Sequence, residues 1–125
     1  MAMRYSPSLK EGIRHTREMQ VKNNDLDTFW GIGNQNVLAI PILIAFIEQT
    51  CIELITPYLE PNYETMCIEM NLKHLKQVQA DAFIHCNVHL KYIDKNNLFF
   101  DISVLNQDME EISHGAHERI IVALK

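Results

Sequence analysis

The chain has 125 residues, of which 47% are hydrophobic, so it is long enough for one domain, residues 1–125, with a sizeable core. Its 11 Lys and Arg against 16 Asp and Glu give a formal net charge of −5, with no block of basic residues, and this excludes general nucleic-acid binding. Three cysteines, Cys51, Cys67 and Cys86, lack the spacing of a zinc site, and we expect reduced thiols in a cytoplasmic protein.

The N-terminal half predicts one strand, one loop and one long helix. Residues 9–21 alternate weakly between apolar and polar and predict an opening strand. Residues 23–36 are rich in turn formers around Phe29 and Trp30, which predicts a loop with an aromatic tip. The apolar run 37–47 opens a helix that has Pro41 in its first turn and ends at Pro57. This 11-residue run is too short to span a bilayer, and the N-terminus lacks the apolar core of a signal peptide, so no membrane contact is expected.

The C-terminal half predicts four strands joined by short turns. Met66, Ile68, Met70 and Leu72 share one parity and should face the helix, and residues 81–92, 98–105 and 112–124 continue the pattern. In the second of these strands, Tyr92 shares the parity of the apolar residues. One dominant helix and five antiparallel strands bury their surfaces together only if the sheet curls around the helix. The predicted class is therefore α+β with the hotdog fold, a five-stranded antiparallel sheet wrapped around one long central helix.

Glu48 is the most informative single residue. It ends the apolar run, and its helical neighbours, including Ile44, Ile52 and Ile55, are apolar with no cation among them. A carboxylate in that setting needs a partner from elsewhere in the fold or a raised pKa, and both are typical of general bases. Glu53, with Gln49 and Thr50 beside it, lies on an ordinary polar face.

His74 extends the apolar parity of its strand and should point toward Glu48. A Glu near a His in an apolar site can activate a water or attack a carbonyl, with the imidazole as partner or proton donor. Backbone amides at the helix N-terminus or on the adjoining strand could stabilise an oxyanion. These features are consistent with thioester hydrolysis.

Other motifs carry less chemistry. His85 and His89 lie two apart on one strand, but no nearby acid or cysteine completes a metal site, so no metal is predicted. Gly31 and Gly33 do not form a phosphate loop, and no serine lies in a nucleophile elbow. His114 and His117 flank Gly115 and fit edge or interface positions better than ligand positions.

A family resemblance rests on four segments: residues 37–41, ending in Pro41; Glu48, seven positions later; Leu72-Lys73-His74-Leu75; and residues 114–122, which contain His117-Glu118-Arg119. Together they resemble the fluoroacetyl-CoA-thioesterase-like branch of hotdog acyl-CoA thioesterases, over residues 9–124. The resemblance implies a homodimer with sheets joined edge to edge, and possible further pairing into tetramers. It implies active sites near the subunit interface, and coenzyme A as substrate carrier rather than as a bound cofactor.

The resemblance also implies site residues. In that branch a Thr, a Glu and a His form the catalytic set, and Glu48 and His74 match the latter two. The threonine position is Ile40, which lacks a hydroxyl, and the usual glycine of the second strand is Cys67, whose amide could bind an oxyanion. Parity directs the Cys67 thiol away from the helix unless a bulge turns it. The remaining candidates are Pro41, Gly33 and Asn34 for substrate, and Lys73, His117 and Arg119 for the coenzyme A phosphates.

Two functions follow as expectations. The first is an acyl-CoA thioesterase that releases free acid and coenzyme A, with Glu48 as base or nucleophile and His74 as its polar partner. The alternative is a catalytically weak or inactive hotdog module that binds acyl-CoA. Ile40 and Cys67 motivate the alternative, because they replace a hydroxyl and the smallest side chain.

Overall fold

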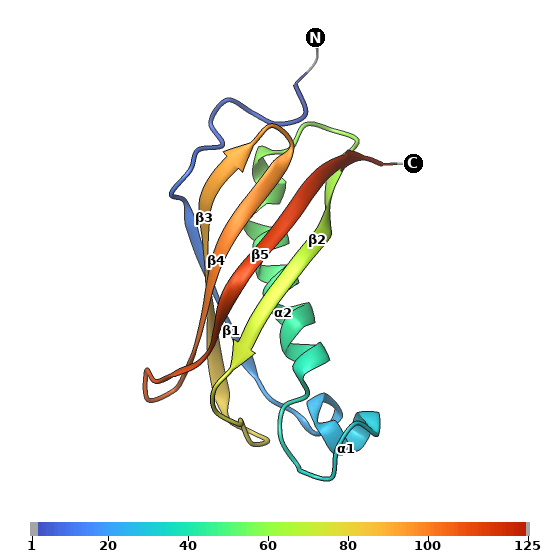
Figure 1. The fold of residues 1–125 in the computed structure, drawn as a ribbon, viewed down its shortest axis with the longest axis vertical. Coiled ribbons are helices and arrows are strands. Elements are labelled where there is room, and N and C mark those ends of the chain that lie inside the picture. Colours follow the sequence, from blue (N-terminus) through green and yellow to red (C-terminus); the bar gives the residue numbers. More distant parts are fainter. Residues whose placement is uncertain (1–2, 125) are drawn as a thin grey trace.

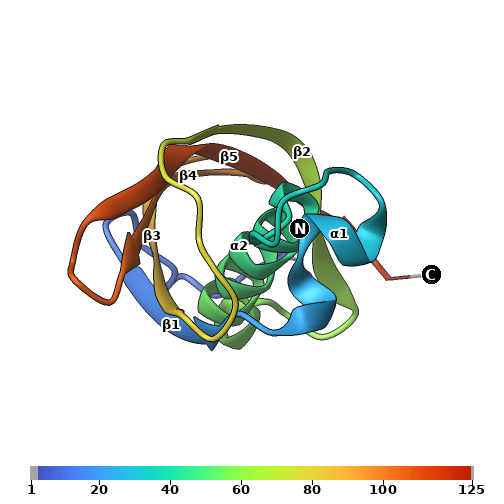
Figure 2. The ribbon, with the colours of Figure 1, turned by 90° about the horizontal axis from the view of Figure 1, so that it is seen from below.

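The structure, a computed structural model, describes residues 3–124. Five strands form one antiparallel sheet in the order β1-β3-β4-β5-β2. They are β1 (Arg14–Gln20), β2 (Tyr63–His74), β3 (Phe83–Asp94), β4 (Asn97–Asn106) and β5 (Glu111–Ala123). The sheet curls around the helix α2 (Ile40–Ile55), as the sequence predicts (Figures 1 and 2). Strands β1 and β2 are the two edges.

Helix α2 fills the concave side of the sheet. It begins at Ile40 with Pro41 in its first turn, where a missing N–H costs no hydrogen bond. Its side chains Leu43, Ile47 and Ile55 are fully buried. The 3-10 turn η2 (Thr56–Tyr58) extends it, so Ile40–Tyr58 is long and apolar enough to span a membrane by length and composition alone. The sheet covers one face of this helix, and Ile52 on another face stays 39% exposed.

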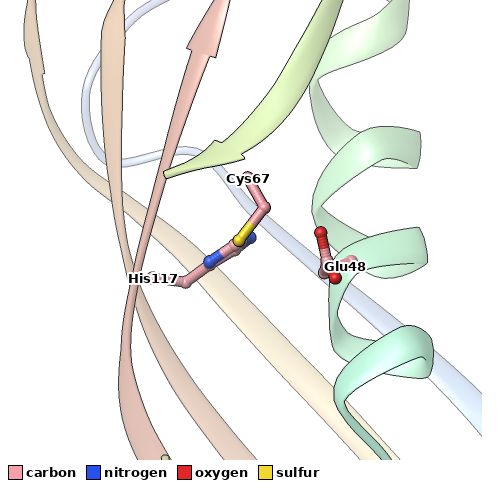
Figure 3. A group of neighbouring side chains, drawn as sticks. All are labelled: Glu48, Cys67 and His117. Atoms are coloured by element: carbon pink, nitrogen blue, oxygen red, sulfur yellow. The ribbon is translucent and has the colours of Figure 1, made fainter. Parts of the chain in front are cut away.

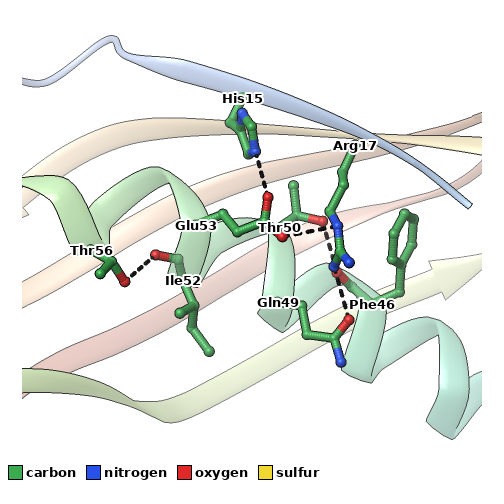
Figure 4. Close-up of polar contacts among 8 residues, drawn as sticks. All are labelled: His15, Arg17, Phe46, Gln49, Thr50, Ile52, Glu53 and Thr56. Atoms are coloured by element: carbon green, nitrogen blue, oxygen red, sulfur yellow. Dashed lines mark hydrogen bonds and ion pairs between the residues drawn. The ribbon is translucent and has the colours of Figure 1, made fainter.

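Polar contacts fasten the first strand to α2 (Figure 4). Glu53 lies 3.1 Å from His15 Nε2 and 2.9 Å from Arg17 Nε. Arg17 also donates to Gln49 at 2.9 Å and lies over the ring of Phe46. These side chains are partly exposed, so Glu53 is on a polar face as predicted, and it joins two elements there.

The predicted alternation holds along most of the sheet. In β3 the side chains of Ile84, Cys86, Val88 and Leu90 are buried, but the pairing register shifts between Leu90 and Tyr92. The extra residue turns Tyr92 to the outside, where it is 44% exposed and stacks on Phe99. The prediction that Tyr92 faces the core is therefore wrong.

A second β-bulge interrupts β2. Cys67 pairs with Arg119 of β5, and the next paired residue is Glu69, so Ile68 is the extra one. Residues before the bulge face inward at odd positions, and residues after it face inward at even positions. The prediction that Met66 and Ile68 pack on the helix is wrong, since they are 55% and 52% exposed.

The segment before α2 contains the short helices η1 (Asn23–Asp25) and α1 (Asp27–Trp30) rather than only loop. Gly31 closes α1 in the left-handed conformation, with φ +70°. Phe29 and Trp30 are 62% and 55% exposed, which confirms the aromatic tip. The Trp30 indole N–H donates to the Asn24 carbonyl at 2.8 Å and fixes that ring.

Candidate active site

Glu48 finds its partner on the last strand. Arg119 Nη1 donates to Glu48 Oε1 at 2.7 Å, and the two side chains are 4% and 29% exposed. Arg119 is the partner that a carboxylate among apolar helical neighbours needs, because a nearby cation stabilises the charged form of a carboxylate. Glu48 is thus held as an oriented group with one side open to solvent.

Arg119 is itself fixed by several acceptors. Its Nε donates to Thr65 Oγ1 at 2.8 Å and its Nη2 donates to the Thr65 carbonyl at 3.0 Å. Thr65 lies on the inner face of β2 because it precedes the bulge. The guanidinium therefore joins α2, β2 and β5 through Glu48, Thr65 and its own strand.

His117 completes the arrangement from the same strand. Its Nδ1 lies 2.7 Å from the carbonyl oxygen of Glu69, an obligate acceptor, so Nδ1 carries the proton. Its Nε2 then accepts from Arg119 Nη1 at 3.1 Å, which makes the ring neutral. Burial lowers the pKa of His117, helped by Arg119 and opposed by the Glu69 hydrogen bond and the Glu48 charge.

Cys67 brings a thiol to the same place (Figure 3). A sulfur, a carboxylate oxygen and an imidazole nitrogen, from Cys67, Glu48 and His117, lie within 4.8 Å of one another. The bulge at Ile68 is the reason, because it leaves Cys67 on the inner face of β2. We call Glu48, Cys67, His117 and Arg119 the Glu48 cluster.

The Glu48 cluster contains three possible metal ligands, but it suits a cation poorly. Arg119 already lies against Glu48 and against the lone pair of His117. A metal ion there would have to displace a buried positive charge that four hydrogen bonds hold. The two histidines of β3, His85 and His89, each lie near a separate carboxylate. His85 Nδ1 is 3.5 Å from Glu18 Oε2, and His89 Nδ1 is 3.7 Å from Asp101 Oδ2.

His74 is the last residue of β2, whereas Thr65 and Cys67 lie in its first half. Its Nδ1 is 2.5 Å from Ser113 Oγ of β5, and burial lowers its pKa, with the Asp27 carboxylate acting in the opposite direction. It is seven residues beyond Cys67, one of them the bulged Ile68, so six regular steps of about 3.3 Å place it about 20 Å along the strand. The expected contact between Glu48 and His74 is therefore not made within one chain, although both side chains face inward.

The other predicted residues have mixed positions. Ile40 and Pro41 form the first turn of α2, Gly33 and Asn34 lie in the exposed loop after α1, and Lys73 is exposed on β2. Arg119 and His117 are only 3% and 2% exposed and serve the Glu48 cluster, so a direct grip on coenzyme A phosphates does not fit them. The expectation of an edge or interface position for His117 is also wrong, because β5 lies between β4 and β2.

Sequence reasoning missed the pairing of Glu48 with Arg119 and the part played by Thr65. Glu48 and Arg119 are 71 positions apart, and no local spacing connects them. The one available signal was the pair of alternate residues His117 and Arg119 near Gly115, which parity places on one face of a strand. The inward turn of Cys67 depends on a bulge that no glycine or proline marks.

A sheet wrapped around one helix, with a paired acid in the middle of that helix, defines a hotdog-fold protein with an acid-centred candidate active site. The chain belongs to the fluoroacetyl-CoA-specific thioesterase family, whose model matches residues 21–125. A curated fluoroacetyl-CoA thioesterase from Streptantibioticus cattleyicolor is 22% identical over 89 residues, 71% of this chain and 63% of that protein. The chain thus matches less than two thirds of that relative's length.

Solved structures agree on the fold. The fluoroacetyl-CoA thioesterase FlK superposes with a TM-score of 0.87 at 20% identity, over 94% of this chain and 90% of that chain. A hot-dog-like protein from Thermanaerovibrio acidaminovorans superposes with a TM-score of 0.83 at 12% identity, over 92% of this chain and 84% of the other. The predicted hotdog fold is confirmed.

Proposed function

We propose that this chain is an acyl-CoA thioesterase, a cytoplasmic enzyme that hydrolyses a thioester to free acid and coenzyme A. Family membership supports thioester chemistry, and the observation that carries the proposal for this chain is the Glu48 carboxylate oriented by Arg119 at 2.7 Å. An oriented carboxylate on an apolar helix, open to solvent on one side, is suited to act as general base or nucleophile at a carbonyl carbon.

The second catalytic residue comes from a second copy in this proposal. Strand β2 is an open edge with exposed apolar side chains at Met66 and Ile68. An antiparallel β2–β2 pairing centred on Asn71 would place His74 of the partner subunit opposite Cys67, because the extra residue Ile68 drops out of the register. Both side chains face inward because of the bulge, so the imidazole would enter the site of Glu48 from the neighbouring chain.

The substrate carrier and the acyl group follow from the same site. With a net charge of −5, the chain offers no long-range attraction for the phosphates of coenzyme A, and exposed Lys73 is the remaining local candidate among the predicted phosphate contacts. Ile40 at the start of α2 presents hydrocarbon, which favours an apolar acyl group.

The first test compares two acids on one helix. The Glu48→Gln variant should hydrolyse acyl-CoA substrates of graded chain length with kcat about 10²–10⁴-fold lower than the parent. Glu53→Gln is the matched control, because Glu53 is also on α2 and ion-paired but has no place in the Glu48 cluster. Equal release of coenzyme A by Glu48→Gln and the parent would remove Glu48 from the chemistry.

The second test asks whether the site is shared. Glu48→Gln and His74→Ala should each be nearly inactive alone. Mixing them, with subunit exchange, should restore about a quarter of parent activity, because half of randomly mixed dimers are mixed and each contains one intact site. Separate inactivity with no recovery on mixing, in a sample proven to exchange subunits, would show that the two residues do not act across the interface.

A second candidate function is an acyl-CoA-binding module without turnover. It is favoured by Ile40, which supplies no hydroxyl beside the acid-bearing helix face. It predicts that acyl-CoA raises the Tm of the parent while no coenzyme A is released. Steady-state hydrolysis and thermal shift, measured on the same acyl-CoA panel, separate the two.

A further inference from the structure

Cys67 differs from the other two cysteines in its surroundings. Cys51 on α2 and Cys86 on β3 are buried in the core, and burial raises the pKa of Cys86 to about 11. Cys67 is exposed, so its side chain contributes little to core packing. A thiol that is reachable by a ligand and not needed in the core is a candidate for chemistry.

The position of this thiol depends on the β2 bulge. In a regular strand Cys67 would share the outward parity of Glu69, Asn71 and Lys73. The extra residue Ile68 reverses that parity, and the thiol turns to the face that carries Thr65 and opposes Arg119. Figure 3 shows Cys67, His117 and Glu48 directed toward one another from β2, β5 and α2.

A base stands within reach of the thiol. The ligand atoms of Cys67, Glu48 and His117 lie within 4.8 Å of one another, close enough for proton transfer directly or through one water. Arg119 donates to Oε1 of Glu48 at 2.7 Å, and a hydrogen bond between Cys67 and the Glu48 carboxylate is among the causes that raise the pKa of the thiol. The carboxylate that Arg119 orients is thus placed to accept the thiol proton.

The thiol needs that base. Partial desolvation, and then the negative charge of Glu48 and a hydrogen bond to it, raise the pKa of Cys67, while Arg119 lowers it. A thiol that retains its proton near neutral pH attacks a carbonyl only if a neighbouring group removes the proton as the bond forms. Ile40, at the start of α2, has no hydroxyl that could take the same part.

We propose that Cys67 is the nucleophile of the thioesterase reaction, with Glu48 as its base; this inference rests on the proposed function. Glu48 accepts the thiol proton while the Cys67 sulfur attacks the thioester carbonyl carbon. The bond from that carbon to the sulfur of coenzyme A breaks, and the departing thiolate takes the proton from Glu48. The product of this half-reaction is an acyl-Cys67 thioester and free coenzyme A.

Water completes the cycle. Glu48 takes a proton from a water that attacks the acyl-Cys67 carbonyl, and the bond to sulfur breaks with return of that proton to Cys67. The sum is one thioester and one water giving one acid and one thiol, with no change of oxidation state. The first half exchanges one alkyl thiol for another, so little energy separates substrate from acyl-enzyme.

The experiment is single turnover followed by mass measurement. The parent protein is mixed with a small excess of acetyl-CoA or hexanoyl-CoA, quenched in acid, and digested at low pH. We expect an acyl increment on the peptide that contains Cys67, a burst of coenzyme A release, and neither in Cys67→Ala. Cys51→Ala is the matched control, since it removes a thiol from the neighbouring helix, and it should retain the increment on Cys67.

Cys67→Gly separates a nucleophile from an obstruction, because glycine keeps the backbone amide and removes only the thiol. We expect kcat to fall by at least about a hundredfold. Parent-like hydrolysis by Cys67→Gly would overturn the inference and leave the proposed function intact. An acyl-Cys67 adduct without turnover would support Cys67 as the group that attacks the thioester, but would overturn both its part in a hydrolytic cycle and the proposed hydrolase. Neither adduct nor hydrolysis with any acyl-CoA would overturn the inference and the proposed function together.

Discussion

At the scale of single residues, two glutamates on α2 show what sequence can and cannot predict. The apolar surroundings of Glu48 predicted that it needs a partner, and the polar surroundings of Glu53 predicted an exposed site; both expectations hold in the structure. The identity of the partner could not be predicted. Arg119 lies 71 positions away and meets Glu48 only because the sheet curls around the helix.

Replacing each arginine partner should therefore have very different costs. Arg119→Met should lower the free energy of unfolding by about 3–5 kcal/mol, since it leaves a partly buried Glu48 charge without a partner. Arg17→Met should cost about 1 kcal/mol, because its pair with Glu53 is half exposed and screened by solvent. Urea unfolding followed by circular dichroism measures both, and equal costs would contradict the assignment.

His117 should make stability depend on pH. Burial is the main reason that the pKa of His117 in the folded chain lies below its usual value of 6.5. As the pH falls through 6.5, the unfolded chain therefore takes up a proton at His117 before the folded chain does. Its contribution is fully present above pH 6.5 and is lost as the pH falls toward the lowered pKa.

Unfolding free energies measured from pH 7.5 to 5 should therefore decline less steeply for His117→Gln than for the parent. His114→Gln, on the exposed face of the same strand, is the control and should keep the parent slope. Because slopes are compared, a uniform loss of stability in His117→Gln does not disturb the test. A parent-like slope in His117→Gln would contradict the role of buried His117.

At the scale of elements, the strands and the long helix were predictable because their periodicity is strong. The helix start was missed by three residues, since Val37 to Ala39 are apolar but extended. The bulges in β2 and β3 were not predictable, because one extra residue changes parity without any change in composition. The side chains of Met66 and Ile68 in β2 and of Tyr92 in β3 were predicted to face the core and are exposed. Both wrong predictions come from these bulges.

The close contact of β2 and β5 gives a prediction for Gly115. A Cβ at this position would lie 2.1 Å from the Asn71 carbonyl oxygen and 3.0 Å from the Leu72 Cα, both backbone atoms that cannot move alone. Gly115→Ala should push β2 away from β5 and lower the free energy of unfolding by about 1–3 kcal/mol.

Hydrolysis should fall with it, since Cys67 and Thr65 move with β2. Ala116→Ser, one residue along on the exposed side of β5, should leave stability nearly unchanged. Thermal melts and kcat measured side by side decide the matter, and a Gly115→Ala protein as stable and active as the parent would contradict so close an approach of the two strands.

At the scale of the whole molecule, the fold class and the family were predictable, and the assembly stays a prediction. Length, composition and element order led to a sheet around a helix. The site was only half predictable. The apolar helical neighbours of Glu48 mark it as a candidate functional residue, whereas its distance from His74 depends on how the complete sheet is built. The proposed dimer reconciles the two residues.

Net charge gives a prediction at the same scale. A chain with a charge of −5 repels an anionic acyl-CoA, and added salt screens that repulsion. KM for acyl-CoA should therefore fall, by about twofold, as the salt concentration rises from low to physiological. Initial rates in graded potassium chloride measure it, and a steep rise of KM with salt would point instead to a strong local cluster of cations.

The aromatic tip described above has a practical consequence. Trp30 is the single tryptophan of the chain, it is half exposed, and its indole is anchored to Asn24. It lies three residues from Asp27, whose charge acts on His74. Tryptophan fluorescence therefore comes from one known place near the His74 end of β2, and its emission wavelength can follow ligand arrival there without any label.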